Sequence, residues 1–263
     1  MSDRPSNRLS NRVAIVTGAA HGLGSAYAAR LIEAGAKVAI VDINGDGADS
    51  VAGALGEKHG ADRVCAFCAD VTDSEAIAAM AAAVAERGGG IDALVNNAGG
   101  GLYPTAPAET FTREQWTRVI DVNLTSTWIC SMAVLPYMRA ARYGKIVNVS
   151  STMVSKGTPL GLVPYIAAKS GIVGLTRALA RELGPDGIRM NAIAPGYVPI
   201  SKPDAVHTPE AAALLQARIA AEQCIPVTLV PDNLAGTVEY LCSADSDFVT
   251  GQVINIDAGW VYN

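Results

Sequence analysis

The strongest constraint on the fold is a regular alternation of two patterns along the chain. Short apolar runs of four or five residues are separated by longer, alanine-rich stretches with helical spacing. Strands joined by helices form right-handed βαβ units, which build a parallel sheet with helices on both faces. Near-continuous apolar runs are typical of strands that are covered on both sides. The predicted strands are 13–17, 37–41, 64–68, 93–96, 145–149, 189–193 and 253–256, and the predicted helices are 24–34, 46–59, 74–87, 113–139, 163–183 and 231–241.

The chain is long enough for one α/β domain with a large core. It has 263 residues, of which half are hydrophobic, and single domains of this size are common. No internal repeat, low-complexity tract or linker divides it. We therefore predict a single α/β domain over residues 1–263, with about seven parallel strands in a doubly wound sheet.

Charge and hydropathy narrow the class of function. A formal net charge of −5 gives no basic surface for nucleic acid or anionic membrane. The first 12 residues are polar, and no uninterrupted apolar run reaches the roughly 18 residues that span a membrane. We expect a cytoplasmic protein that binds neither nucleic acid nor membrane.

The five cysteines are expected to be reduced thiols, because their number is odd and no secretion signal precedes them. Cys65 and Cys68 have C-x-x-C spacing. No second pair or nearby histidines complete a zinc site, and the pair lies in a predicted strand rather than at a helix start. No metal site is predicted.

One segment breaks the alternation. Residues 197–225 contain three prolines and then a helical stretch at 210–223. The segment follows the carboxyl end of a predicted strand, where α/β folds bind ligands, so we predict a substrate lid. The alternative is an ordinary surface excursion.

A glycine-rich turn joins the first predicted strand to the first helix. The spacing Gly-x-x-x-Gly-x-Gly lets the backbone approach a pyrophosphate, whose charge is stabilised at the helix N-terminus. This pattern predicts a dinucleotide site. Its residues are Gly18, His21, Gly22, Leu23 and Gly24.

Asp42 ends the second predicted strand. A carboxylate in this position accepts hydrogen bonds from the adenosine ribose and repels a 2′-phosphate. Neither Arg nor Lys lies in the glycine turn or closely after Asp42. We therefore predict NAD rather than NADP. The alternative is that Asp42 caps a turn with Asn44-Gly45.

Further polar residues follow the next two predicted strands. Asp70-Val71 follows the third strand, and Asn97-Ala98-Gly99 follows the fourth. Both lie where a dinucleotide would cross the sheet, although each taken alone is also compatible with a simple turn.

Tyr165 and Lys169 are four residues apart and share one face of a predicted helix. A phenol beside an ammonium group can act as a proton donor and acceptor near neutral pH. The spacing alone is common by chance. It gains weight from the motifs that surround it.

The order of motifs resembles the short-chain dehydrogenase/reductase family, in its single-domain branch of Rossmann-type fold. The resemblance covers about residues 9–261. The motifs are Thr-Gly-x-x-x-Gly-x-Gly at 17–24, Asn-Asn-Ala-Gly at 96–99, Asn123, Ser150-Ser151, Tyr165-x-x-x-Lys169 and Pro195-Gly196.

The resemblance implies a role for each matching residue. Tyr165 would be the general acid/base, and Lys169 would lower its pKa and hold the nicotinamide ribose. Ser151 would bind the substrate oxygen, and Asn123 a water that leads to Lys169; taken alone, Asn123 is also compatible with a helix cap or a satisfied core asparagine. The implied cofactor contacts, besides the glycine turn, Asp42, Tyr165 and Lys169, are Asp70, Val71, Asn97, Ala98, Gly99, Pro195, Gly196 and Val198.

The chain departs from the family pattern in two places. The serine usually precedes the tyrosine by 13 residues; here Ser151 precedes it by 14, and Thr152 stands at 13. The Val-Ser-Ser ending of the strand favours Ser151, with Thr152 as the alternative. After Pro195-Gly196, Ile200 and Ser201 replace a threonine that often contacts the nicotinamide, so Ser201 or the backbone would make that contact.

Three functions are compatible with these motifs. The favoured one is an NAD-dependent dehydrogenase of secondary alcohols or sugars. The second is an NADPH-dependent 3-oxoacyl reductase, against which Asp42 argues. The third is a non-catalytic dinucleotide sensor, against which the intact set of acid/base residues argues. Lys156 and His207 are either cations for an acidic or polyhydroxylated substrate or solvent-exposed. A homotetramer is expected from the family resemblance.

Overall fold

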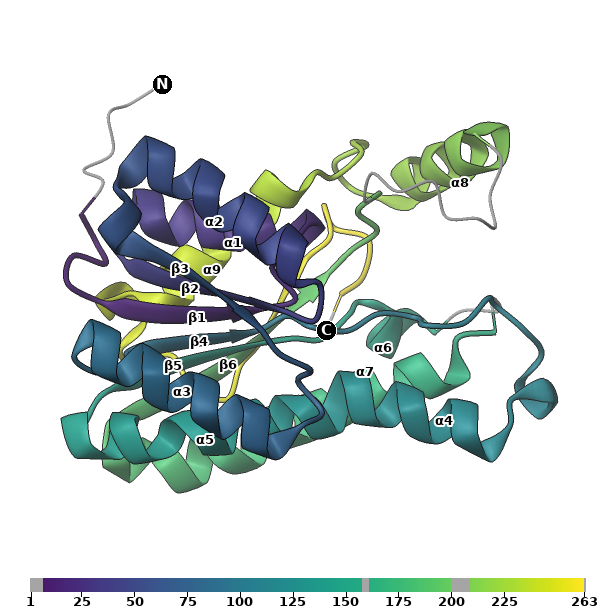
Figure 1. Ribbon diagram of the computed structural model, residues 1–263. Helices are drawn as coiled ribbons and strands as arrows, with labels where there is room; N and C mark the ends of the chain where they lie inside the picture. Colours follow the sequence, from purple (N-terminus) through teal and green to yellow (C-terminus); the bar gives the residue numbers. More distant parts are fainter. Residues whose placement is uncertain (1–6, 158–160, 200–208, 263) are drawn as a thin grey trace.

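The computed structural model describes residues 7–157, 161–199 and 209–262, and its centre is one twisted sheet (Figure 1). The sheet has seven strands in the order β3-β2-β1-β4-β5-β6-β7, and every adjacent pair is parallel. The strands are β1 (Val13–Thr17), β2 (Lys37–Asp42), β3 (Val64–Cys68), β4 (Ala93–Asn96), β5 (Gly144–Val149), β6 (Ile188–Pro195) and β7 (Val253–Ile256). The predicted doubly wound parallel sheet is confirmed.

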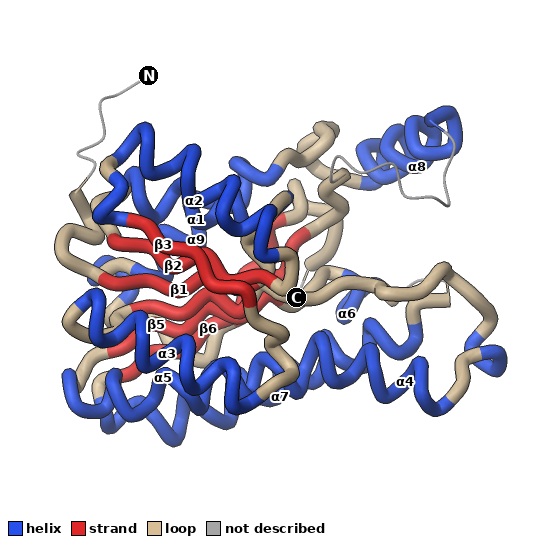
Figure 2. Tube along the Cα trace, in the orientation of Figure 1, coloured by secondary structure: helices blue, strands red, loops and turns tan. Residues whose placement is uncertain are grey.

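Helices cover both faces of the sheet, as the two-sided apolar strands require. One layer contains α1 (Gly22–Glu33), α2 (Gly45–His59) and α9 (Pro231–Cys242). The other contains α3 (Ser74–Gly88), α5 (Ser126–Ala141) and α7 (Val163–Leu183), as the blue helices above and below the red strands in Figure 2 show. Each layer buries its own hydrophobic cluster against the sheet.

The predicted helix 113–139 is not a uniform α-helix. It consists of α4 (Arg113–Ile120), a π-helical turn (Asp121–Thr125) and α5. A π-turn inserts an extra residue into the helix and is frequent at functional sites. A second element was not predicted: α6 (Met153–Lys156) has only four residues, too few to leave a periodic signal.

The helix from Arg113 to Ala141 is long and apolar enough, by length and composition, to cross a membrane; an 18-residue window within it has a mean hydropathy of 1.3. In the structure its second half packs on α3 and the sheet. Cys130, Val134 and Met138 belong to the buried core. Packing against the sheet therefore accounts for its composition.

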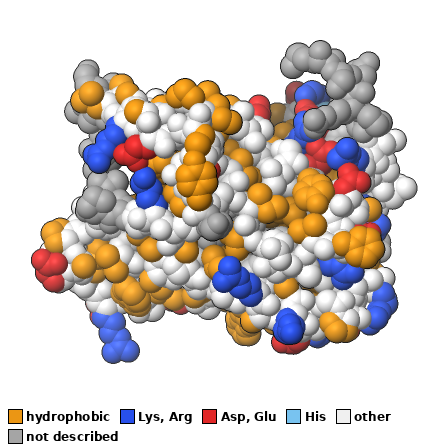
Figure 3. Space-filling model, turned by 180° about the vertical axis from the view of Figure 1, so that it is seen from behind, with side chains coloured by type: hydrophobic (Ala, Val, Ile, Leu, Met, Phe, Trp, Pro, Cys, Tyr) orange, Lys and Arg blue, Asp and Glu red, His pale blue; other side chains and the backbone are white. Residues whose placement is uncertain are grey.

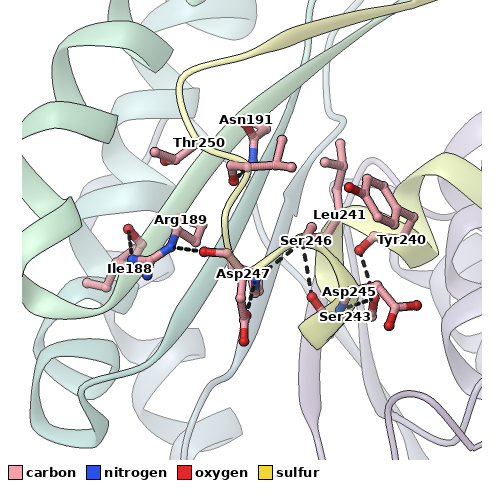
Figure 4. A network of polar contacts seen from close by, with 12 residues as sticks. Ile188, Arg189, Asn191, Tyr240, Leu241, Ser243, Asp245, Ser246, Asp247 and Thr250 are labelled. Carbon is pink, nitrogen blue, oxygen red and sulfur yellow. Dashed lines mark hydrogen bonds and ion pairs between the residues drawn. The ribbon is translucent and has the colours of Figure 1, made fainter.

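At the amino-terminal edge of the sheet, polar contacts fasten the segment after α9 to β5 and β6 (Figure 4). Arg189 Nε donates to the carbonyl of Asp247 (2.6 Å), and Asn191 Nδ2 donates to the carbonyl of Val249 (2.8 Å). The buried Lys145 ammonium pairs with the Asp247 carboxylate at 2.7 Å. These contacts stabilise the edge opposite to the predicted site.

The chain reverses direction across the sheet between β1 and β4. It winds outward from β1 to β3 and then crosses back to β4, which lies beside β1. Such a switch point leaves a crevice at the carboxyl ends of the strands, where open α/β folds bind their ligands. Thr17, Asp42, Asn96 and Pro195 all end strands on this edge.

Candidate active site

The glycine turn after β1 and the Asn97 segment after β4 are joined by hydrogen bonds. Thr17 Oγ1 accepts from the backbone N–H groups of Asn97 and Ala98, both at 3.1 Å. Asn97 Nδ2 donates to the carbonyls of Thr17 (3.0 Å) and Gly18 (2.9 Å). The Asn97 amide N–H groups therefore hold the turn itself, which the sequence alone did not indicate.

Two glycines of the turn are required by close packing. Gly18 has a φ of +63°, and a Cβ there would lie 2.7 Å from the Cα of Ala98. A Cβ on Gly24 would overlap the carbonyl oxygen of Gly18. His21, just before α1, makes no side-chain cap bond to the helix. The N–H groups of the first turn thus lack helical partners and fit a pyrophosphate.

Asp42 lies at the carboxyl end of β2, largely buried, and faces the glycine turn. Its Oδ2 accepts from Ala20 N (3.0 Å), and its Oδ1 accepts from Asn44 N (2.9 Å). Asp42 therefore does cap the turn at Asn44, as the alternative interpretation expected. A carboxylate has about four acceptor positions, so two of them are left for ribose hydroxyls.

Asp70 is held in a turn of its own. Its Oδ1 accepts from the backbone N–H (2.8 Å) and hydroxyl (2.7 Å) of Thr72, and Arg118 lies 3.7 Å from Oδ2. The Thr72 bonds, with Arg118, hold the pKa of the Asp70 carboxyl below its usual range. Val71 beside it is buried.

Ser151, not Thr152, faces Tyr165. The Ser151 hydroxyl is close enough to the Tyr165 hydroxyl to lower its pKa. The Thr152 hydroxyl instead donates to the carbonyl of Pro195 at 3.1 Å. The extra residue of spacing is accommodated in the segment between Ser151 and α7, which includes α6. The geometry therefore favours Ser151 as the hydroxyl partner of Tyr165.

Lys169 lies one turn after Tyr165 on α7 and is buried. Its Nζ donates to the carbonyl of Val149 (2.7 Å) and lies 5.7 Å from the centroid of the Tyr165 ring. Burial lowers the pKa of Lys169 to about 8. Within the described ranges Val149 is the one acceptor of this ammonium, so two of its three N–H groups fit the hydroxyls of a cofactor ribose or a water.

Burial also dominates at Tyr165, where it raises the pKa of the hydroxyl, while the Ser151 hydrogen bond acts in the opposite direction. The sequence predicted that Lys169 lowers this pKa. In the protein alone the pKa of Tyr165 is raised instead, because Tyr165 is half-buried beside the buried Lys169 and withdrawal from water disfavours every charged form.

Asn123 lies in the π-turn and its side chain is fully bonded to backbone. Nδ2 donates to the carbonyls of Gly100 and Val119 (both 3.0 Å), and Oδ1 accepts from Gly100 N (2.9 Å). A Cβ on Gly99 would lie 2.5 Å from Asn123 Oδ1 and 3.3 Å from Lys169 Nζ. The π-turn thus brings Asn123 next to Gly99 and Lys169.

The remaining predicted positions also lie on this edge. Gly196 N donates to the carbonyl of Ile256 (3.0 Å), which fastens the end of β6 to β7. Leu23 and Val198 pack against the core, and His21 is exposed. Ile200, Ser201 and His207 lie outside the described residues. Over the described ranges no three His, Cys, Asp or Glu side chains cluster as metal ligands would.

A parallel sheet with a glycine turn at its switch point, and beside it a half-buried tyrosine with a buried serine, lysine and asparagine, defines a dinucleotide-dependent oxidoreductase. Comparison with known proteins gives the family. The family model described as enoyl-(acyl carrier protein) reductase matches residues 18–261. The chain belongs to the short-chain dehydrogenase/reductase family, as the sequence predicted.

Relatives with different substrates are similarly close. The chain is 39% identical to cis-4-hydroxycyclohexanecarboxylate dehydrogenase of Sinomonas cyclohexanicum, over 95% of this chain and 96% of the relative. It is 38% identical to 3-oxoacyl-[acyl-carrier-protein] reductase of Thermotoga maritima (97% and 99%) and to galactitol 2-dehydrogenase of Agrobacterium fabrum (96% and 98%). A Sinorhizobium meliloti 1021 crystal structure, provisionally described as a short-chain alcohol dehydrogenase, superposes with a TM-score of 0.88 at 36% identity, covering 98% of both chains.

Proposed function

We propose that this protein is an NAD-dependent oxidoreductase that interconverts a secondary alcohol, on a polyol or a hydroxylated ring, and the corresponding ketone. The observation that carries the proposal is the half-buried Tyr165 side chain, whose hydroxyl interacts with that of Ser151 and which has the buried Lys169 ammonium one helical turn away. A half-buried phenol beside a buried ammonium has no purpose in packing, whereas proton transfer needs both.

Each residue of the cluster has a distinct role in the proposed reaction. Ser151 hydrogen-bonds the substrate oxygen, and Tyr165 takes the alcohol proton during oxidation or gives it to the carbonyl during reduction. The free N–H groups of Lys169 bind the cofactor ribose, and its charge favours the tyrosinate. Asn123 holds the backbone around Gly100 against this cluster. The bound dinucleotide supplies the hydride acceptor or donor and, when oxidised, a positive charge.

The proposed preference for NAD rests on Asp42. Its carboxylate lies largely buried beside the glycine turn and has acceptor positions left for ribose hydroxyls. A 2′-phosphate in the same place would meet a negative charge, and neither the turn nor the residues closely after Asp42 supply a compensating cation. The remaining proposed cofactor contacts are Gly18, His21, Gly22, Leu23, Gly24, Asp70, Val71, Asn97, Ala98, Gly99, Pro195, Gly196 and Val198.

Two other functions remain open to test. The second candidate function is a reductase of acyl thioesters, because some relatives are named 3-oxoacyl-[acyl-carrier-protein] reductase. A non-catalytic dinucleotide sensor is the third. Relatives named for galactitol and D-threitol support the polyol class, and the one named for a hydroxycyclohexane acid supports the ring class.

A homotetramer in the cytoplasm is the expected setting. Trp128 and Phe248 are exposed, and α5 and α7 form a groove lined by Leu124, Trp128 and Leu175. Hydrophobic side chains are scattered among polar ones over the face seen in Figure 3, a distribution that is common on protein surfaces, so the expectation of an oligomer rests on the groove and on the family. Sedimentation of the purified protein tests the oligomer: a monomer at micromolar concentration would exclude it.

Measuring absorbance of the reduced cofactor during incubation with a panel of secondary alcohols, polyols and 3-oxoacyl thioesters tests the function. We expect oxidation of at least one polyol or cyclic alcohol with NAD, and at least tenfold weaker use of NADP. Faster reduction of a 3-oxoacyl thioester with NADPH than any alcohol oxidation would favour the second candidate.

A further inference from the structure

Three segments beside the proposed active site meet at one carboxylate, that of Glu222. Lys156, the last residue of α6, places its Nζ 2.6 Å from Glu222 Oε2. Trp260, in the segment after β7, donates its Nε1–H to the same oxygen at 2.9 Å. Glu222 itself is the last residue of α8 (Pro209–Glu222). The three residues are distant in sequence and come from three different elements.

The cluster is closed, because its two donors also touch each other. The Lys156 ammonium lies over the Trp260 ring, 4.7 Å from its centroid. The hydrogen bonds from Lys156 and Trp260 hold the pKa of Glu222 down, to about 2, so this carboxylate is ionised at neutral pH. The Lys156 and Glu222 side chains are about one third exposed (34% and 38%). Lys156 is therefore bound to protein groups and is not a free cation for an acidic substrate.

Other bonds tie two of the three segments together independently. The backbone N–H of Cys224 donates to the carbonyl of Gly259 (3.3 Å), and that of Ile225 to the carbonyl of Ala258 (3.0 Å). The chain after α8 and the chain after β7 are thus one unit. Lys156 attaches α6 to this unit.

The position of α6 bears directly on the catalytic serine. α6 begins two residues after Ser151, and the N–H of its first residue, Met153, donates to Ser151 Oγ at 3.2 Å. A helix of four residues is not stable on its own in water, so it depends on contacts at its ends. The residue that caps its C-terminal end, Gly157, has a φ of +66°. Fixing Lys156 therefore fixes the group that orients the Ser151 hydroxyl.

We propose that Glu222 is a positioning residue for the oxidoreductase reaction: it clamps α6 through Lys156 and Trp260 and so holds the Ser151 hydroxyl in place towards Tyr165. The inference rests on the proposed function for its kinetic consequence. Its structural consequence, a fixed α6, is independent of any substrate.

Hydrogen exchange of the protein saturated with NAD tests the clamp directly. In Glu222→Gln the amides of residues 153–157 should exchange about three- to tenfold faster than in the wild type, the factor expected for loss of a charged hydrogen bond in a partly exposed cluster. The exchange rates of the amides of residues 163–183 should be the same as in the wild type. The matched control is Glu33→Gln, because Glu33 accepts from Lys58 at 3.0 Å with similar exposure (42%) far from α6. It should leave residues 153–157 as in the wild type.

A second variant keeps the test decisive if one variant folds poorly. Lys156→Met should accelerate exchange of the same amides, and the double variant should be no worse than either single variant, since both remove one cluster. Equal exchange in the wild type and Glu222→Gln, or additive effects in the double variant, would overturn the proposal.

Kinetics separate this inference from the proposed function. With the alcohol selected in the substrate panel, Glu222→Gln should lower kcat/KM for the alcohol about three- to tenfold, while the Kd for NAD measured by fluorescence stays unchanged. If no alcohol is oxidised, the proposed function fails, and the hydrogen-exchange data still test whether Glu222 holds α6 in place. If alcohols are oxidised at an unchanged kcat/KM, the positioning role of Glu222 is overturned while the proposed function stands.

Discussion

Replacing Lys169 by Met should inactivate the enzyme and at the same time stabilise the protein at neutral pH. Burial lowers the pKa of Lys169 from 10.5 to about 8. A shift of this size corresponds to about 3 kcal/mol of penalty for keeping the ammonium charged in the folded state. Met fills a similar volume without charge, although it leaves the carbonyl of Val149 without its hydrogen bond, which costs about 1–2 kcal/mol.

The sign of the pH dependence follows from the direction of the shift. The folded pKa is lower than the unfolded one, so between about pH 8 and 10.5 the unfolded chain holds a proton that the folded protein has released. The contribution of Lys169 to the free energy of unfolding therefore rises with pH across this window. Below pH 8 the full penalty is present.

Thermal melting of the dinucleotide-free proteins from pH 6 to 10 measures the effect. At pH 7 the Lys169→Met variant should melt above the wild type by roughly 2–8 °C, from a net gain of about 1–2 kcal/mol. The difference should shrink as the pH rises from 8 to 10. Lys37→Met, at an exposed residue at the start of β2, is the control and should not change the melting temperature. A variant that melts well below the wild type, by an amount independent of pH, would refute the reasoning.

Three further predictions concern the site. Ser151→Ala should lower kcat/KM by about 10²-fold or more, the scale of a lost catalytic hydrogen bond. In Thr152→Val, kcat/KM should stay within about threefold of the wild-type value, because the Thr152 backbone N–H also bonds Pro195 (3.1 Å). Equal losses of kcat/KM in the two variants, measured by steady-state kinetics, would contradict the assignment. Asp42→Ala should reduce the ratio of the NADP and NAD dissociation constants by about tenfold or more, the effect of losing one charged contact. Fluorescence titration measures both constants, and an unchanged ratio would contradict the role of Asp42. Gly24→Ala should abolish dinucleotide binding and lower stability by about 2 kcal/mol or more, because its Cβ overlaps a backbone carbonyl; calorimetry showing wild-type binding would contradict this.

The sheet could be predicted because its signal is local. Each strand is a short apolar run between helical segments, and alternation of this kind allows few topologies. β1, β3, β4 and β7 have the predicted bounds, while β6 extends beyond the predicted 189–193 to Ile188–Pro195. The extra length of β6 comes from pairing with β5 and β7, which its own sequence does not encode.

The π-turn and α6 could not be predicted, for physical reasons. The residues of the π-turn continue the helical pattern of α4 and α5, while the contacts that Asn123 makes from this turn are with Gly100, a residue outside the helix. α6 is shorter than the period that reveals a helix. Its position depends on Glu222, which is 66 residues from Lys156 in the chain.

The choice between Ser151 and Thr152 also required the three-dimensional structure. Sequence spacing left both hydroxyls possible; they are separated by the interaction of Ser151 with Tyr165 and by the bond from Thr152 to Pro195 at the end of β6. The role of Asn97 is similar, because its partners Thr17 and Gly18 belong to a distant segment of the chain.

The most direct test of the account is the rate of NAD reduction by Tyr165→Phe with the alcohol that the wild type oxidises best. The account predicts a loss of at least about 10³-fold in kcat, within the range for removal of a general acid/base, with the Kd for NAD and the melting temperature close to those of the wild type. A variant that retains more than about a tenth of the wild-type rate would contradict it, because proton transfer would then not depend on Tyr165.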